Sequence, residues 1–351
     1  MTQRTIAAIV AVPMVVALLV AAWWKPLPYV TYEPGLTLDV LAQDNGSEII
    51  QVQGHQTYRT DGELRMTTVY VSRLNAKLRL FELMGDWLNN KDAVYPYDAV
   101  YQKDETVADS QATGAVDMVT SQDAATAVAL HELNYDVQPA TEVFFVGDGV
   151  PASGNLKVRD IFLEANGNVV KSADDVTKAV DATPAGKSVT FVVRRDGKRT
   201  TVKVTPEQKD GKPTIGIQLG TGFVFPFKVE INIDPNIGGP SAGLMFSLGI
   251  YDTLTPGSLT GGQTVAGTGT IADVATGKVG PIGGIQQKIA GARAAGAELF
   301  LVPAPNCHDA NGASNGNMRL VKVTTMHSAV KSIGAWVANP DAALPSCQGA
   351  S

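Results

Sequence analysis

Three shortages narrow the functions open to this chain of 351 residues. Its net charge is -6, and without an excess of basic residues nucleic acid is not expected to be its main partner. Cysteines are scarce, with Cys307 and Cys347 late in the chain. In an oxidising compartment these two would form a disulfide, and the alternative is a pair of free, half-buried thiols. Histidines are few, and none lies in a glycine-marked turn or has an obvious orienting acid: His55, His131, His308 and His327.

Charge is also missing from one long stretch near the N-terminus. From Ile6 to Trp24 the chain reads IAAIVAVPMVVALLVAAWW, without a charged residue. At about 1.5 Å per residue, a helix of this length nearly crosses a hydrocarbon layer of about 30 Å. Residues 1–26 are therefore predicted to form a transmembrane anchor. A cleaved signal peptide is the alternative, although the run exceeds the usual apolar core of about 7–15 residues. In both cases residues 27–351 are expected outside the cytoplasm.

The rest of the chain divides by pattern into three units and a tail, and the predicted fold class is α+β: residues 27–125, 126–206, 207–340 and 341–351. In the first unit the alternating runs EIIQVQG and TTVYVSRL predict half-buried strands. The run SQDAATAVAL near its end predicts a helix capped by Ser121.

The second unit carries the signals of a small β-rich domain. Asp196-Gly197 joins two β-rich runs as a hairpin, and Ser172 is predicted to cap a short helix. With the preceding segment VPASGNLKVRDIFLEANG, these features resemble a PDZ domain of the bacterial protease type. Where such domains usually have Gly-Asp, this chain has Arg159-Asp160, and no clean carboxylate-binding loop is visible. The resemblance implies capture of peptide C-termini or extended segments, and the alternative is a domain that only spaces or orients its neighbour.

The third unit contains the run NIGGPSAGLMFSLGI, residues 236–250. Gly239 and Pro240 are typical of a helix start, so we expect a helix from Pro240 with Ser241 on its apolar face. A serine in that position lies beside backbone N–H groups that can hold the oxyanion of an acyl-transfer reaction. The simpler interpretation is a capping or packing residue, and the serine alone does not decide between them.

A base for Ser241 is offered by a lysine. Residues 279–305 predict a glycine turn, a helix from Ile285, a break at Gly296 and a strand ELFLVP. Lys288 falls on the apolar stripe of that helix, and its stem could lie along the core with the ammonium in water. If the amine is buried instead, its pKa can fall by about 3–5 units from about 10.4. A neutral Lys288 could then take the proton of the serine hydroxyl.

These elements together resemble the proteolytic domain of Lon-type serine proteases. GGPSAGL, GTGTI, PIGGIQQK and LFLVP follow one another in the order of that family. The resemblance implies that Ser241 is the nucleophile, Lys288 the general base and Thr268 a residue that helps orient the lysine amine. With the anchor and the PDZ-like unit, the chain is similar to the membrane-anchored, PDZ-containing Lon-like proteases of bacteria. That resemblance also implies hexameric assembly.

The chain departs from the family pattern in several places. The family often has an acidic residue three positions before the serine, where this chain has Gly238, and Asp234 lies further off. The spacing from serine to lysine is slightly longer than in ATP-dependent members. No GxxxxGK[ST] phosphate loop is present, so ATP-driven unfolding is not expected, and neither is a cofactor or a metal. Upstream, IIQVQGHQTYRTDGELRMTTVYV and DMVTSQDAATAVAL resemble the first strands and first helix of the family. Residues 27–125 are therefore expected to be the first half of a proteolytic domain into which the PDZ-like unit is inserted.

The function expected from these observations is that of an ATP-independent serine endopeptidase with a Ser-Lys dyad. It would cut unfolded or exposed polypeptides outside the cytoplasm, at the bacterial cell membrane. One alternative is a non-catalytic PDZ scaffold whose Lon-like domain only assembles partners. Another is a hydrolase that pairs the serine with a histidine.

Overall fold

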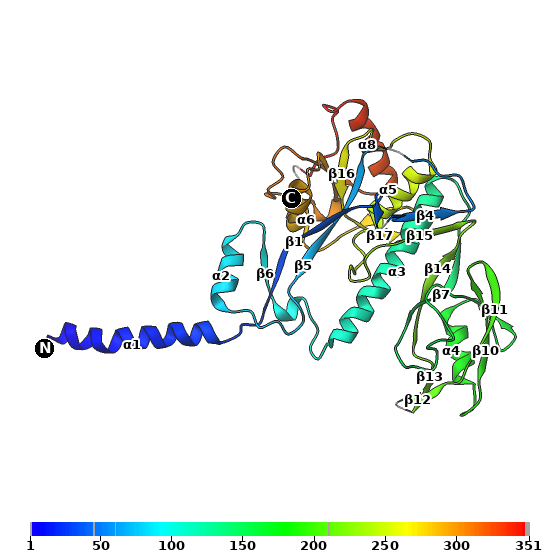
Figure 1. The fold of residues 1–351 in the computed structure, drawn as a ribbon, viewed down its shortest axis with the longest axis horizontal. Coiled ribbons are helices and arrows are strands. Elements are labelled where there is room, and N and C mark those ends of the chain that lie inside the picture. The colour runs from blue at the N-terminus through cyan, green and yellow to red at the C-terminus, as the bar shows by residue number, and fades with distance from the viewer. Residues whose placement is uncertain (1, 45, 60, 210, 348–351) are drawn as a thin grey trace.

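The protein is described by a computed structural model that covers residues 2–44, 46–59, 61–209 and 211–347. Figure 1 shows the N-terminal helix α1 (Gln3–Trp24) extending away from the body of the molecule. Within the body, the long helix α3 (Val107–Glu132) contacts elements of two β-rich units. Helices and strands occur in both units, which confirms the expected α+β class. The last four residues of the expected tail lie outside the described residues.

The larger unit is built around a mixed sheet whose strands come from both ends of the chain. In spatial order the strands are β20 (Arg319–Val323), β19 (Leu299–Pro303), β16 (Thr264–Gly267), β5 (Glu63–Val71), β1 (Tyr29–Asp39) and β6 (Ala93–Pro96). Strand β5 runs parallel to β16 and antiparallel to β1. A second pairing, between β4 (Ile50–Gln53) and β15 (Lys228–Ile231), also joins early and late segments. Segments far apart in sequence therefore share one core.

Helices cover both faces of this sheet, because alternate side chains of each strand point to opposite faces. Leu299 and Leu301 of β19 belong to the buried cluster that includes α5 (Gly243–Leu254), α3 and α8 (Met326–Ala338). Phe300 and Val302 belong to the cluster of α6 (Ile285–Ala294). Shorter elements complete the unit: α2 (Leu80–Leu88), α7 (Cys307–Ala310), the 3-10 helices Tyr97–Ala99 and Ala304–Asn306, and the paired strands β2 (Gln43–Asp44) with β3 (Ser47–Glu48) and β17 (Thr270–Asp273) with β18 (Lys278–Gly280).

The smaller unit has its own sheet and its own core. Its strands in spatial order are β11 (Lys198–Val204), β10 (Val189–Arg195), β8 (Ile161–Ala165), β7 (Gln138–Val146) and β14 (Ile217–Val224), with β9 (Asn168–Val169) on β8 and a separate hairpin of β12 (Glu207–Lys209) and β13 (Lys212–Thr214). Helix α4 (Ala173–Asp181) follows Ser172, as expected, and the Ser172 N–H donates to Asp175 at 3.1 Å. Asp196 and Gly197 both have positive φ, 48° and 74°, which confirms the hairpin between β10 and β11.

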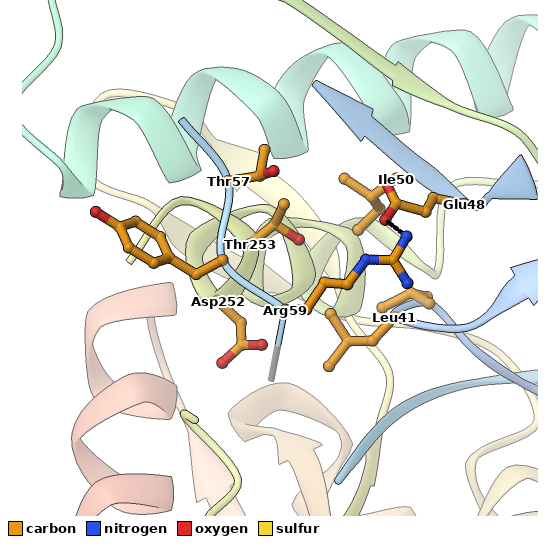
Figure 2. A pocket seen from close by; sticks show the side chains of 9 residues that line it. Leu41, Glu48, Ile50, Thr57, Arg59, Asp252 and Thr253 are labelled. Atoms are coloured by element: carbon orange, nitrogen blue, oxygen red, sulfur yellow. Dashed lines mark ion pairs between the residues drawn. The ribbon is translucent and has the colours of Figure 1, made fainter. Parts of the chain in front are cut away.

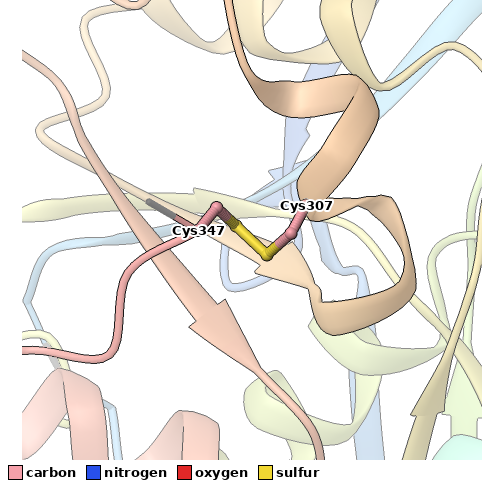
Figure 3. The surroundings of a disulfide bond; sticks show 2 residues. All are labelled: Cys307 and Cys347. Carbon is pink, nitrogen blue, oxygen red and sulfur yellow. A yellow bond between two sulfur atoms is a disulfide. The ribbon is translucent and has the colours of Figure 1, made fainter. Parts of the chain in front are cut away.

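The two cysteines are joined. Figure 3 shows the disulfide between Cys307, at the start of α7, and Cys347 in the C-terminal segment. Both side chains are buried in the cluster that also contains α6. Of the two alternatives left open by the sequence, the structure therefore contains the disulfide.

The predicted start of the helix in the first unit is wrong. Helix α3 begins at Val107, well before Ser121, and Thr106 caps it by accepting a hydrogen bond from the Asp109 N–H at 3.1 Å. The Thr106 and Asp109 pair forms a capping box, which begins the helix earlier than the predicted cap at Ser121. Ser121 is buried in the middle of the helix.

Helix α1 has the length and composition of a membrane span. Its mean hydropathy over an 18-residue window is 2.7, and none of that window is buried against the rest of the protein. A signal sequence near an N-terminus meets the same criteria. The helix is therefore a candidate membrane anchor.

Candidate active site

Ser241 lies in a turn directly before α5. The helix begins at Gly243, later than the predicted start at Pro240, because backbone hydrogen bonds to Gly269 hold Ser241 and Ala242 in a turn. The turn is held by backbone bonds on both sides. The Ser241 carbonyl accepts from the Gly269 N–H at 2.8 Å, and the Leu244 N–H donates to the Gly269 carbonyl at 3.0 Å. Ser241 is therefore half-buried on a fixed turn, not on a helical face.

Lys288 lies on α6, as the sequence predicts, and its side chain points into the core. Ile285, Ile289 and Ala292 share the stripe with Lys288, and all four residues are buried. Lys288 itself is 2% exposed. Burial lowers the pKa of the Lys288 ammonium from 10.5 to about 7. The alternative in which the ammonium reaches water does not hold, and near neutral pH a large share of the amine is uncharged.

Thr268 connects the lysine to the turn that carries the serine. The Lys288 Nζ donates to Thr268 Oγ1 at 3.2 Å. Thr268 Oγ1 in turn donates to the Ser241 carbonyl at 3.0 Å. Thr268 is completely buried and follows β16, directly beside β5 in the sheet. Among the described residues no direct hydrogen bond joins Ser241 Oγ to Lys288 Nζ, so Thr268 connects the lysine amine to the backbone of Ser241, not to its hydroxyl.

Ser241 and Lys288 line the same cavity of about 250 Å³. Its walls come from β1, β5, α3, the loop before α5 and α6: Leu36, residues 66–71, Met118, residues 236–239, Ser241, Ala242 and Lys288. The sequence did not indicate that β5 and α3 contribute to this cavity, because their distance along the chain hides their contact in space.

The helix α3 holds the loop that precedes Ser241. Ser121 Oγ donates to the Pro240 carbonyl at 3.1 Å. The Gly239 N–H donates to the Gly114 carbonyl at 3.3 Å. A Cβ at Gly238 would lie 3.3 Å from Gly114 Cα, so a larger side chain there would press on the helix backbone. This contact explains why the acidic residue often found at this position in the family has little room here.

Asp234 does not replace that missing acid. It accepts hydrogen bonds from both the backbone N–H and the Nδ2 of Asn236, each at 2.8 Å. Asp234 therefore shapes the loop and is not among the residues that line the cavity of Ser241 and Lys288.

The structure does not bring a histidine to Ser241. No histidine is among the described residues that line its cavity. His55 Nε2 is hydrogen-bonded to the Tyr135 hydroxyl at 2.7 Å, and His327 is paired with Glu132 at 2.7 Å. The described residues also contain no cluster of three or more histidine, cysteine or acidic side chains that could hold a metal ion.

A second group of buried ionisable side chains lies where α3 meets the smaller unit. Arg159 forms an ion pair with Asp123 of α3, and its Nη2 donates to Gln122 Oε1 at 2.8 Å. Glu142 of β7 lies beside them and is 3% exposed. Burial, together with the nearby negative charge of Asp123, raises the pKa of Glu142 to about 8. The sequence predicted none of these contacts.

Among the described residues, other cavities lie away from Ser241, and two of them bear on the units described above. One of about 140 Å³ separates α4 from the edge strand β14, with Val176 and Val180 on one side and Ile215 and Leu219 on the other. The other, of about 130 Å³, lies at the opposite end of α5. Figure 2 shows it between Thr253 and the ion pair of Arg59 with Glu48.

Comparison with known proteins agrees with the two units. Residues 235–333 match the family of the Lon protease (S16) C-terminal proteolytic domain, and residues 116–205 match the PDZ domain family. The chain therefore contains a region similar to the Lon-type (S16) proteolytic domain and a region similar to PDZ domains, which confirms its resemblance to PDZ-containing Lon-like proteases. The PDZ match begins inside α3, so this helix is shared between the two units.

Individual relatives cover smaller parts of the chain. The probable protease eep of Enterococcus faecalis is 42% identical over 72 residues, which are 20% of this chain and 17% of that protein. Two solved PDZ domains of SdrC-like proteins also match. The one from Listeria innocua is 26% identical, with 23% of this chain and 92% of that chain covered and a TM-score of 0.22. The one from Listeria monocytogenes is 30% identical, with 23% and 86% covered and a TM-score of 0.21.

Proposed function

We propose that the protein is an ATP-independent serine endopeptidase in which Ser241 is the nucleophile and Lys288 the general base. The observation that carries this proposal is a lysine, 2% exposed and with its pKa lowered to about 7, lining the same cavity as a serine on a fixed turn. Perturbed lysines of this kind are characteristic of sites that move protons. The absence of a phosphate-loop motif from the sequence supports independence from ATP.

The chemistry follows from the arrangement of the three side chains. Neutral Lys288 takes the proton from Ser241 Oγ as the oxygen attacks the carbonyl carbon of a peptide bond. The resulting ammonium returns that proton to the nitrogen of the leaving amine, and the peptide bond breaks to leave an acyl group on Ser241. Water then attacks the carbonyl carbon of this ester while Lys288 accepts its proton, and the ammonium returns that proton to Ser241 Oγ as the bond between the acyl carbon and Oγ breaks. Thr268 holds the Lys288 amine through the 3.2 Å hydrogen bond and so limits its orientation.

The proteolytic unit was expected to consist of residues 27–125 and 207–340. Because β14 (Ile217–Val224) pairs with β7 in the smaller sheet, the second part begins after β14 in this proposal, and the PDZ unit is inserted between the two parts. The parallel pairing of β5 with β16 supports it, because the two strands come from opposite sides of the insertion. The contacts between α3 and α5 support it as well. Several copies of the chain would assemble into a hexameric ring, as its resemblance to the Lon-like proteases implies.

The PDZ unit is proposed to bind peptide C-termini or extended segments of polypeptide substrates. The supporting feature is the cavity between α4 and the edge strand β14, whose free edge can accept an added strand. Gly216, with a φ of +75°, turns the chain into that strand. The sequence did not suggest this loop as a peptide site.

The chain is proposed to be a single-pass protein of the bacterial cell membrane, with the body outside the cytoplasm. Support comes from α1 and from α2, which leaves apolar side chains exposed on one face, including Phe81 and Leu88 at 44% and 73%. Trp23 of α1 lies 5.4 Å from the Phe81 ring. Trp87, 75% exposed, flanks the same face. A helix of this kind, next to the end of a membrane span, suits the bilayer surface.

The experiment that tests the proposed activity compares the parent protein with Ser241→Ala on a permanently unfolded, fluorescently labelled polypeptide, without ATP. The parent is expected to release labelled peptides, and the variant is expected to release none above background while keeping its unfolding transition. Equal cleavage by the two proteins would exclude Ser241 as the nucleophile. Absence of cleavage by the parent would favour the non-catalytic scaffold.

A further inference from the structure

Arg159 occupies a backbone conformation that an arginine rarely adopts. Its φ is +73°, in the left-handed region that favours glycine. PDZ domains of the type resembled here usually have a glycine at this place, so the arginine departs from the pattern where the backbone favours the smaller residue. The neighbouring Asp160 holds this loop to β10, because its carboxylate accepts hydrogen bonds from Arg195 Nε at 2.7 Å and Arg195 Nη2 at 2.6 Å.

The contacts of the Arg159 side chain account for this departure. Its guanidinium crosses from the PDZ loop to α3, where it forms an ion pair with Asp123 and donates to Gln122 Oε1 at 2.8 Å. Asp123 is 1% exposed, so its charge has no compensation from water. An arginine fork can reach two acceptors at once, which a shorter residue at this position could not do.

Glu142 completes the cluster from the PDZ side. Asp123 Oδ2 and Glu142 Oε1 are both buried, and neither has a hydrogen-bond partner when both groups are treated as ionised. A proton on Glu142 lets one carboxyl donate to the other, and the raised pKa of Glu142, about 8, is in agreement with such a proton at neutral pH. The buried cluster then contains one negative and one positive charge and is balanced.

Helix α3 also contacts the loop of the candidate nucleophile, through a residue two positions before Asp123. Ser121 precedes Asp123 on α3 and donates to the Pro240 carbonyl at 3.1 Å, immediately before Ser241. Earlier on α3, the Gly114 carbonyl accepts from the Gly239 N–H at 3.3 Å. A shift of α3 would therefore move the turn of Ser241 relative to Lys288, which lies on the separate helix α6.

We propose that Arg159 is a positioning residue through which the PDZ unit fixes α3 and thereby holds the turn of Ser241 in place for reaction with Lys288. This inference rests on the proposed function. It assigns the PDZ unit a second task besides peptide binding, since a side chain of that unit adds to the core contacts that hold α3. A displacement of about 1 Å at a reacting group can reduce a rate by about a hundredfold, so even a small release of α3 is measurable.

The test uses the full chain and the variant Arg159→Gly, which suits the positive φ and removes only the guanidinium. The primary measurement is hydrogen exchange of the backbone amides in residues 236–242, which requires no activity. Exchange there is expected to rise by about tenfold or more. In cleavage of a short peptide, kcat is expected to fall by about tenfold while KM changes less than about twofold, because positioning affects the reaction more than binding.

Four further variants make the test specific. Arg199→Ala removes an ion pair with Glu164 that stays within the PDZ unit, and it is expected to leave loop exchange and kcat unchanged. Asp123→Asn combined with Arg159→Gly is expected to be no slower than Asp123→Asn alone, because the two residues act as a pair. Arg159→Lys keeps the positive charge, and its kcat is expected to lie between that of the parent and that of Arg159→Gly. It replaces the glycine variant in the test if that variant fails to fold.

Two outcomes overturn the proposal. One is unchanged exchange in residues 236–242 and unchanged kcat in Arg159→Gly. The other is an equal effect of Arg159→Gly and Arg199→Ala. If the parent does not cleave any substrate, the proposed function fails, and the exchange measurement still decides whether Arg159 holds the loop.

Discussion

Replacing Lys288 with methionine is expected to make the proteolytic unit more stable, not less. With a pKa near 7 in the folded protein and 10.5 as its ordinary value, Lys288 costs the fold about 5 kcal/mol at low pH, at about 1.36 kcal/mol per unit. Methionine has a similar length and no charge, so Lys288→Met removes this cost. It also removes the hydrogen bond to Thr268, which is worth about 1 kcal/mol.

The dependence on pH identifies the cause. Between pH 7 and 10.5 the unfolded chain binds a proton at Lys288 that the folded chain has lost, so the parent gains stability as the pH rises. The advantage of Lys288→Met over the parent is therefore expected to be about 4 kcal/mol below pH 6, about 3 kcal/mol at pH 7, and close to zero or slightly negative above pH 10.5.

Denaturant unfolding followed by tryptophan fluorescence provides the assay. Trp336 of α8 is 4% exposed and belongs to the core cluster of the proteolytic unit, so its emission shifts on unfolding. Lys331→Met, at an exposed position on the same helix, is the matched control and is expected to change stability by less than about 0.5 kcal/mol at each pH. A difference between Lys288→Met and parent that stays constant from pH 6 to 10 would refute a buried amine with a lowered pKa.

Three more perturbations have defined outcomes. Thr268→Val is expected to lower kcat about tenfold with little change in KM, because Lys288 loses the hydrogen bond that orients it. Steady-state kinetics on a short peptide would measure this, and a rise in KM alone would contradict it. Cys307→Ser opens a loop with a sequence separation of 40, and the free energy of unfolding is expected to fall by about 4 kcal/mol. If chemical reduction of the parent left its unfolding midpoint unchanged, the disulfide would not be supported. In vesicles of brominated lipid, with the two tryptophans of α1 replaced by phenylalanine, the emission of Trp87, taken as the difference from a variant that also carries Trp87→Phe, is expected to fall by about half. An unquenched difference would place α2 away from the bilayer.

Features set by neighbours in sequence were predictable. The spacing of Ile285, Lys288 and Ile289 placed the lysine on a buried helical stripe, and all three side chains are buried. The Asp196-Gly197 pair adopts the positive φ values that its hairpin requires. In each case a few adjacent residues determine the local conformation, so the pattern is sufficient.

Features set by contacts between distant segments were not predictable. The run SQDAATAVAL predicted the cap of α3 at Ser121, yet the helix begins at the capping box of Thr106 and Asp109. Ser121 instead holds the Pro240 carbonyl, and Arg159 reaches Asp123, across separations that no local pattern reveals. The start of α5 was misplaced for a related reason, since the bonds to Gly269 shape the turn of Ser241.

The most direct measurement of the central claim is the rate at which a serine-reactive fluorophosphonate modifies Ser241, followed by intact mass and peptide mapping from pH 5 to 9. The account predicts a single adduct on Ser241 whose rate rises with an apparent pKa of about 7, the value of the Lys288 ammonium, and a rate near background in Lys288→Met. An adduct at another residue, or a rate on Ser241 that is the same with and without Lys288, would contradict it.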